Sequence, residues 1–99
     1  MKLQELTKIP KVLGAGVVTK DGFLVESQFT VGYDAEKYGA MAARIVSQIH
    51  KSLRLDSSSV ILYAPNIVFF IKAKGDGILF AVGNKDANLG LIKIKFDKI

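Results

Sequence analysis

Three continuous apolar runs in the second half of the chain constrain its fold more than any other feature. The runs "VILY", "IVFFI" and "ILFAV" form the centres of segments 58–65, 66–74 and 77–83. Proline, asparagine, glycine and aspartate, which are typical of turns, lie between these segments. Strands that are apolar without interruption are generally buried on both faces. The pattern therefore predicts three strands of a sheet that is covered by helices above and below.

Two further strands are expected in the first half of the chain, at residues 12–20 and 23–29. The Asp-Gly pair at 21–22 between them favours a two-residue hairpin turn of type I′. Gly14 and Gly16 lie inside the first of these strands, where a glycine often marks the close approach of another element. A nucleotide-binding loop would need its glycines between a strand and a helix. We therefore interpret them as points where a helix packs closely on the strand.

Residues 34–54 show the clearest helical pattern, with Asp34 as a suitable N-cap and Lys51 and Arg54 in the last turn, where the helix dipole favours cations. Apolar side chains cover roughly half of the helix circumference, which is more than one core contact requires. One apolar stripe holds Tyr38, Met41, Ala42, Ile45 and Ile49, and a second holds Ala35, Gly39, Ala43 and Val46. We expect one stripe to cover the sheet and the other to contact a second copy of the chain. The alternative is a helix sunk deep in its own core.

The two ends of the chain have weaker patterns. A short helix is expected at the start, where Leu3, Leu6 and Ile9 recur at three-residue spacing before Pro10. In the final segment, 83–99, "IKIKF" alternates like a strand, and this local pattern slightly favours a strand. A helix there would instead align Leu89, Ile92, Phe96 and Ile99 on one face.

The composition excludes several kinds of chemistry. The chain has no cysteine and one histidine, His50. This rules out disulfides, thiolate zinc sites and cysteine nucleophiles, and argues against a histidine-built metal site. The stretch "GNKD" approaches the guanine-reading motif of GTPases, but Asp86 follows Lys85 directly, and no phosphate loop accompanies it. We expect neither an enzyme nor a cofactor, and an ordinary, satisfied or exposed role for His50.

The formal charge of +5 raises the question of nucleic acid. The basic residues are scattered along the sequence and only two are arginine, whereas a nucleic-acid footprint requires clustering. We therefore expect a solvated, lysine-rich surface and no specific nucleic-acid partner. The sequence shows no signal peptide and no apolar stretch long enough to span a bilayer. A cytoplasmic protein without a membrane partner is expected.

Three segments in order resemble one known family. "IPKVLGAGVVTKDGFLVES", "GYDAEKYGAMAARIVSQI" and "GNKDANLGLIKIKF" are similar to the opening, the central helix and the ending of the roadblock family of dynein light chains and their prokaryotic relatives. The resemblance runs from about Leu6 to Phe96. It implies a single α+β domain over residues 1–99, with the profilin-like order αββαβββα. A five-stranded antiparallel sheet would lie between helices as a three-layer sandwich, and the ending would be a helix.

The same resemblance implies a function. Family members are non-catalytic dimers that bind small Ras-like GTPases, as scaffolds or as activators of GTP hydrolysis. It implies a homodimer through the central helix and the third strand, with Tyr38, Met41, Ala42, Ile45, Ile49, Val60 and Leu62 at the interface. The exposed polar positions of that helix, which would meet the GTPase, are Lys37, Arg44, Gln48 and Lys51. A small-molecule-sensing or general protein-interaction module of a related fold is the alternative.

Overall fold

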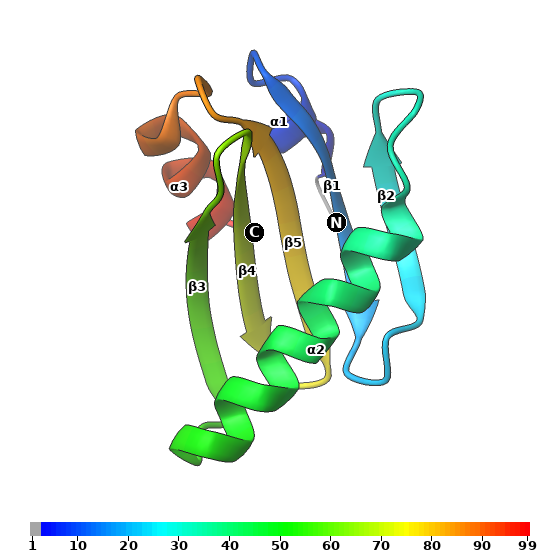
Figure 1. The fold of residues 1–99 in the computed structure, drawn as a ribbon, viewed down its shortest axis with the longest axis vertical. Coiled ribbons are helices and arrows are strands. Elements are labelled where there is room, and N and C mark those ends of the chain that lie inside the picture. Colours follow the sequence, from blue (N-terminus) through cyan, green and yellow to red (C-terminus); the bar gives the residue numbers. More distant parts are fainter. Residues whose placement is uncertain (1–2) are drawn as a thin grey trace.

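The chain folds in the order expected from its sequence. A computed structural model describes residues 3–99 (Figure 1). Its elements are α1 (Leu3–Thr7), β1 (Val12–Thr19), β2 (Leu24–Phe29), α2 (Ala35–Leu53), β3 (Ser57–Tyr63), β4 (Ile67–Lys74), β5 (Gly77–Asn84) and α3 (Leu89–Asp97). This is the order αββαβββα that the family resemblance implies, and the prediction of the fold class is confirmed.

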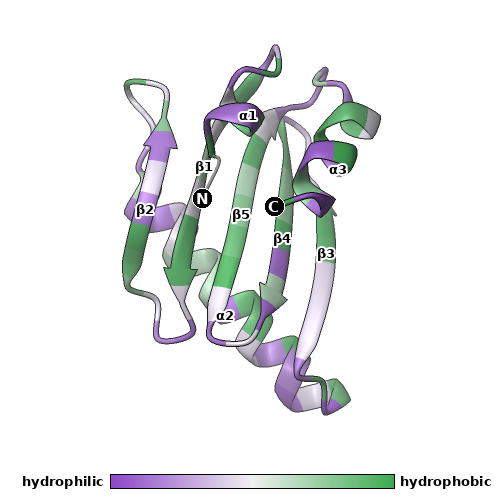
Figure 2. Cartoon of the chain, turned by 180° about the vertical axis from the view of Figure 1, so that it is seen from behind, coloured by the Kyte–Doolittle hydropathy of each residue, from purple (hydrophilic) through white to green (hydrophobic). Residues whose placement is uncertain are grey.

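The five strands form one antiparallel sheet in the order β2-β1-β5-β4-β3. The helix α2 crosses one face of this sheet diagonally, while α1 and α3 lie on the opposite face (Figures 1 and 2). We call these the α2 face and the α1/α3 face. No helix within residues 3–99 has the length and apolar character to cross a membrane.

The central strands are buried on both faces because their side chains alternate between two cores. In β4, Val68 and Phe70 point into the core beneath α1 and α3, while Phe69 and Ile71 point into the core beneath α2. Both cores are closed by aromatic contacts, such as the edge-to-face pair of Phe69 and Phe80 at a centroid distance of 6.2 Å. The expectation of a sheet covered on both sides is therefore met at its centre.

The strand β3 departs from that expectation. It carries the apolar run "VILY", yet Ile61, Leu62 and Tyr63 are 38%, 40% and 66% exposed. The prediction that all three runs are buried on both faces is wrong for this strand. The reason is its place in the sheet: β3 is an edge strand with a single neighbour, and α2 passes over only its first residues (Figure 1).

Two predictions about β1 are also wrong in detail. Gly14 lies opposite Phe29 of β2, and Gly16 lies opposite Phe80 of β5. A Cβ atom at Gly16 would come within 2.6 Å of the Phe80 ring, and one at Gly14 would overlap the Phe29 ring. The glycines therefore leave space for aromatic rings from neighbouring strands, not for a helix.

The β1–β2 turn is not of type I′, because only its glycine has a positive φ, 93° at Gly22. The Gly22 amide donates a hydrogen bond to the Thr19 carbonyl, and the Thr19 amide donates to the Phe23 carbonyl. The loop therefore contains three residues rather than two. This is the hairpin in which a type I turn is followed by a glycine that forms a bulge.

The last segment is a helix, as the family resemblance implies and against its local alternation. Asn88 caps it by accepting a hydrogen bond from the Leu91 amide at 3.0 Å. Ile92 and Phe96 are buried on the sheet, where the Phe96 ring lies 5.9 Å from that of Phe70, while Ile94 is 55% exposed. Burial of these two side chains outweighs the weak local preference for a strand.

Candidate interaction surface

The helix α2 is held firmly on the sheet by one of its two predicted stripes. Its start is capped by Asp34, whose carboxylate accepts a hydrogen bond from the Lys37 amide at 3.1 Å. The buried residues of the helix are small, which lets it approach the sheet closely; they are Gly39, Ala42, Ala43 and Val46. The second stripe, which contains Gly39, Ala43 and Val46, therefore makes most of the contact with the sheet. Ala42, from the first stripe, contributes to the same contact.

The first stripe remains partly uncovered. Tyr38, Ile45 and Ile49 are half-buried and Met41 is 38% exposed. Ala42 differs from the others because its exposed fraction is 0%. It can therefore support an interface from beneath but cannot contact a partner. The stripe also extends one turn further than the sequence analysis assigned, because Leu53 follows Ile49 at four-residue spacing and is 66% exposed. The same i, i+4 spacing could have identified Leu53 in advance.

The uncovered stripe continues onto β3. Val60 and Leu62 pair with Ile71 and Phe69, so they share the α2 face of the sheet with those residues. Phe69 also makes an edge-to-face contact with Tyr38, at 5.9 Å between ring centroids. We call the continuous apolar patch the α2–β3 surface; it consists of Tyr38, Met41, Ile45, Ile49, Leu53, Val60 and Leu62.

The backbone of β3 is open next to this surface. One edge of β3 pairs with β4 and the other pairs with no strand of the sheet. Exposed edges are usually protected by charges, prolines or bulges, but "SSSVILY" contains no charge and no proline. The opposite edge strand, β2, carries Glu26, and its pairing is interrupted by a register shift. The edge of β3 is thus the less protected of the two.

The predicted polar positions form a second row beside the apolar one. Lys37, Arg44, Gln48 and Lys51 are all exposed. The Gln48 amide donates a weak hydrogen bond to the Ser52 hydroxyl at 3.4 Å. Within residues 3–99, the one side-chain ion pair joins Lys93 to Asp97 on α3. The three cations of this row are therefore available to an acidic partner.

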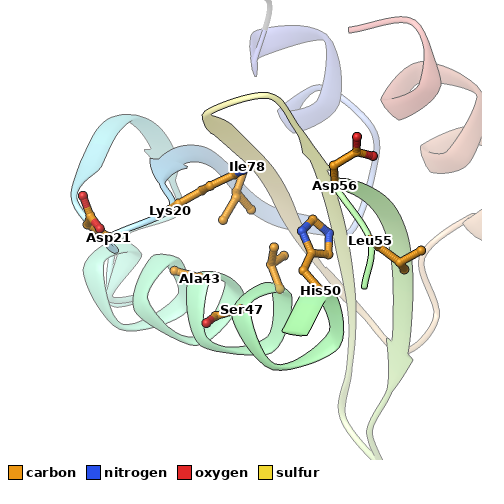
Figure 3. A pocket seen from close by; sticks show the side chains of 9 residues that line it. Lys20, Asp21, Ala43, Ser47, His50, Leu55, Asp56 and Ile78 are labelled. Carbon is orange, nitrogen blue, oxygen red and sulfur yellow. The ribbon is translucent and has the colours of Figure 1, made fainter. Parts of the chain in front are cut away.

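A hollow of about 430 Å³ lies at the lower end of the sheet and is a candidate binding site for a small molecule. Its apolar floor comes from Ala43, Val46 and Ile78, and the carboxylates of Asp21 and Asp56 lie at opposite ends of it (Figure 3). Lys20, Ser47 and His50 also line it, but its two carboxylates do not converge on one point, as the charged groups of a specific ligand pocket do. The small-molecule alternative gains no support from it.

His50 lies at the edge of this hollow. Its Nε2 atom is 2.7 Å from the hydroxyl oxygen of Ser58, which ties the end of α2 to the start of β3. A satisfied histidine of this kind is what the sequence suggested.

Comparison with known proteins identifies the family. The model of the Roadblock/LC7 domain matches residues 1–84. Two uncharacterized proteins of Methanocaldococcus jannaschii are each 32% identical over 97 residues, which covers 93% of this chain and 84% of each relative. A third from the same organism is 32% identical over 96 residues, with 93% of this chain and 81% of the relative covered.

Solved structures agree on the fold. A Roadblock/LC7 domain from Streptomyces avermitilis has a TM-score of 0.80 at 14% identity, covering 93% of this chain and 82% of that one. Myxococcus xanthus MglB has a TM-score of 0.74 at 19% identity, covering 94% and 80%. The gliding protein MglB of Thermus thermophilus has a TM-score of 0.78 at 14% identity, covering 97% and 78%. The chain belongs to the Roadblock/LC7 domain family.

Proposed function

We propose that the protein is a non-catalytic, homodimeric adaptor that binds a small Ras-like GTPase and regulates it. The observation that carries the proposal is the α2–β3 surface, where an apolar helix stripe and an unprotected strand edge lie side by side. Contiguous apolar patches on protein surfaces commonly mark sites of association. The GTPase part of the proposal rests on the family resemblance and on the basic row of α2.

A second copy of the chain fits this surface for two reasons. Pairing of β3 with its counterpart would satisfy the open backbone edge and continue the sheet across the dimer. The same two-fold arrangement would bring the α2 helices together, because in an isologous interface each surface meets its own equivalent. The apolar positions Met41, Ile45, Ile49 and Leu62 would then be covered without any change in the fold of the monomer.

The GTPase would dock on the polar row of the paired helices. Small GTPases are recognised by partners through switch segments, whose order depends on the bound nucleotide. The cations of Lys37, Arg44 and Lys51 would favour acidic residues near those segments and speed the encounter. The apolar stripe beside them is occupied in the dimer, so specificity would come from the polar row.

The test separates dimer formation from GTPase binding. The GTPase is captured from native extract on the immobilised protein with GTP or GDP added, and its affinity for purified variants is measured by calorimetry. Reversal of two charges, Arg44→Glu with Lys51→Glu, should weaken GTPase binding about tenfold or more while light scattering still reports a dimer. Ile45→Asp should instead damage folding or the dimer, since it would bury an unpaired charge.

A matched control is available on the other side of the sheet. Lys74→Glu with Lys95→Glu makes the same change in net charge on exposed or half-exposed side chains of the α1/α3 face. It should leave the affinity for the GTPase within about twofold. If the α2 pair binds the GTPase as well as the parent does, α2 is not the docking site; a monomer mass for the parent at micromolar concentration would reject the dimer.

A further inference from the structure

The fold gathers lysines that are scattered in the sequence. Five lie on β4, on α3 and at the C-cap of α3, together with the carboxylate of Asp97; they are Lys72, Lys74, Lys93, Lys95 and Lys98. These six side chains account for four of the five net positive charges of the chain. Asp56 and Asp76 line a hollow together with Lys74.

Lys72 of the strand reaches the end of α3. The Lys72 ammonium group lies 3.5 Å from the Asp97 carbonyl oxygen and 3.4 Å from a main-chain oxygen of Ile99. Lys74 is two residues further along β4 and therefore points to the same face. Figure 2 shows this hydrophilic part of β4 beside the hydrophilic last turn of α3.

Hydroxyl groups extend the same patch to the sheet edge. Ser59 pairs with Lys72, and Ser57 pairs with Lys74, so two serines and two lysines form an array on one face of an antiparallel strand pair. A hollow of about 420 Å³ opens there, lined by Ser57, Ser58, Ser59, Lys72, Ala73 and Lys74. We call the array and the α3 lysines together the basic face.

Apolar side chains are exposed at the margin of the basic face. Ile61 and Tyr63 pair with Phe70 and Val68 of the core under α3, so they lie on this side of β3, yet they are 38% and 66% exposed. Ile94 projects from the outer side of α3 and is 55% exposed. A partner for this face must therefore offer both negative charge and apolar groups.

We propose that the basic face binds an acidic, amphipathic segment of another protein. All five of its cations are lysine, whereas both arginines of the chain lie in and just after α2. The exposed apolar side chains of Ile61, Tyr63 and Ile94 beside these cations suit an amphipathic protein segment better than the phosphate backbone of nucleic acid. Ile94 lies on the outer side of α3 and Ile61 lies on the sheet, so these apolar groups stand at two levels of a stepped face. A protein segment that follows this step can contact both.

The proposal does not rest on the GTPase hypothesis, because it concerns the opposite face of the sheet. The probe is a fluorescent helical peptide in which leucine recurs at i, i+4 among glutamates; a second peptide replaces leucine by serine at the same charge. Binding is followed by fluorescence anisotropy at about 0.15 M salt, where surface charges beyond roughly 8 Å are largely screened. The parent should bind the leucine peptide several-fold more tightly than the serine peptide.

Two triple variants with equal changes in net charge locate the site. Lys74→Glu, Lys95→Glu and Lys98→Glu together should weaken binding about tenfold or more. The matched triple on α2, with Lys37→Glu, Arg44→Glu and Lys51→Glu, should change it by less than about twofold.

Ile94→Ser should weaken binding of the leucine peptide and leave the serine peptide unaffected. Amide shifts in an NMR titration should be confined to β3, β4 and α3. Equal losses in the two triple variants, or shifts centred on α2, would show a non-specific charge effect and overturn the proposal. Tighter binding of single-stranded DNA or of anionic vesicles than of the leucine peptide would overturn the proposal of a protein partner. The absence of any binding at about 1 mM leucine peptide would also overturn it.

Discussion

Truncation of Leu62 is the sharpest test of the α2–β3 surface, because its effect on the dimer can be worked from its exposure. Full burial of a leucine side chain contributes about 2 kcal/mol. Leu62 is 40% exposed in the single chain, so a partner could still cover about two fifths of it, worth roughly 0.8 kcal/mol per copy. Two copies give about 1.6 kcal/mol. Leu62→Ala should therefore raise the dimer Kd by about tenfold.

The same variant should lower the free energy of unfolding by only about 1 kcal/mol, because the covered part of Leu62 is lost as well. Leu62→Glu should abolish the dimer at micromolar concentration, since a carboxylate would be buried at the seam. Sedimentation equilibrium measures the Kd, and thermal melting followed by circular dichroism reports the fold. Val25 on the opposite edge strand, 66% exposed, provides the matched control. If Val25→Glu weakens the dimer as much as Leu62→Glu does, or if neither weakens it, the reasoning about β3 is wrong.

Three further predictions concern the fold. Gly14→Ala should lower the free energy of unfolding by about 1–3 kcal/mol in a urea titration, because its new methyl group would overlap the packed ring of Phe29. Asp34→Ala should lower it by about 1 kcal/mol through loss of the N-cap, with Asp34→Asn as the conservative control. Ile92→Ala should cost about 2–5 kcal/mol while Ile94→Ala stays within about 0.5 kcal/mol, and the reverse order would contradict the helical assignment of α3.

The sequence predicts the elements well because hydrophobic periodicity determines them locally. The apolar runs of β4 and β5 and the stripes of α2 appear in the structure where the pattern placed them. The final segment differs, because "IKIKF" alternates like a strand but is helical in the structure, where Ile92 and Phe96 are buried and Phe96 contacts Phe70 of β4. Such a contact is invisible to a local pattern, and here the family resemblance supplied the correct answer.

The order of strands and the surfaces that depend on it could not be read from local patterns. The run in β3 is as apolar as those in β4 and β5, and nothing within it indicates an edge. Lys72 and Asp97 are separated by 24 intervening positions and meet only because α3 folds back over β4. The α2 stripe was predictable in advance because it lies within one helix. The basic face was not, because it joins a strand to a helix.

The two proposed surfaces are connected through β3, and this connection has a measurable consequence. If β3 pairs with its counterpart, the two copies of β4 lie three strand spacings apart, so roughly 14 Å is the smallest separation of the two copies of Lys72. Each such pair of charges repels by about 0.2 kcal/mol at 0.01 M salt and by less than about 0.1 kcal/mol at 0.15 M salt. Summed over the several lysines of each basic face, the repulsion between the two copies is about 1 kcal/mol weaker at 0.15 M salt than at 0.01 M salt.

The dimer should therefore tighten by about fivefold as salt rises over this range, and an acidic peptide on the basic face should tighten it at low salt. The triple variant Lys74→Glu, Lys95→Glu and Lys98→Glu should lose the salt dependence. Sedimentation equilibrium at both salt concentrations measures each effect. A dimer Kd that does not change with salt in the parent, or that changes equally in the triple variant, would show that the two basic faces do not lie side by side. The dimer interface would then have to lie away from β3.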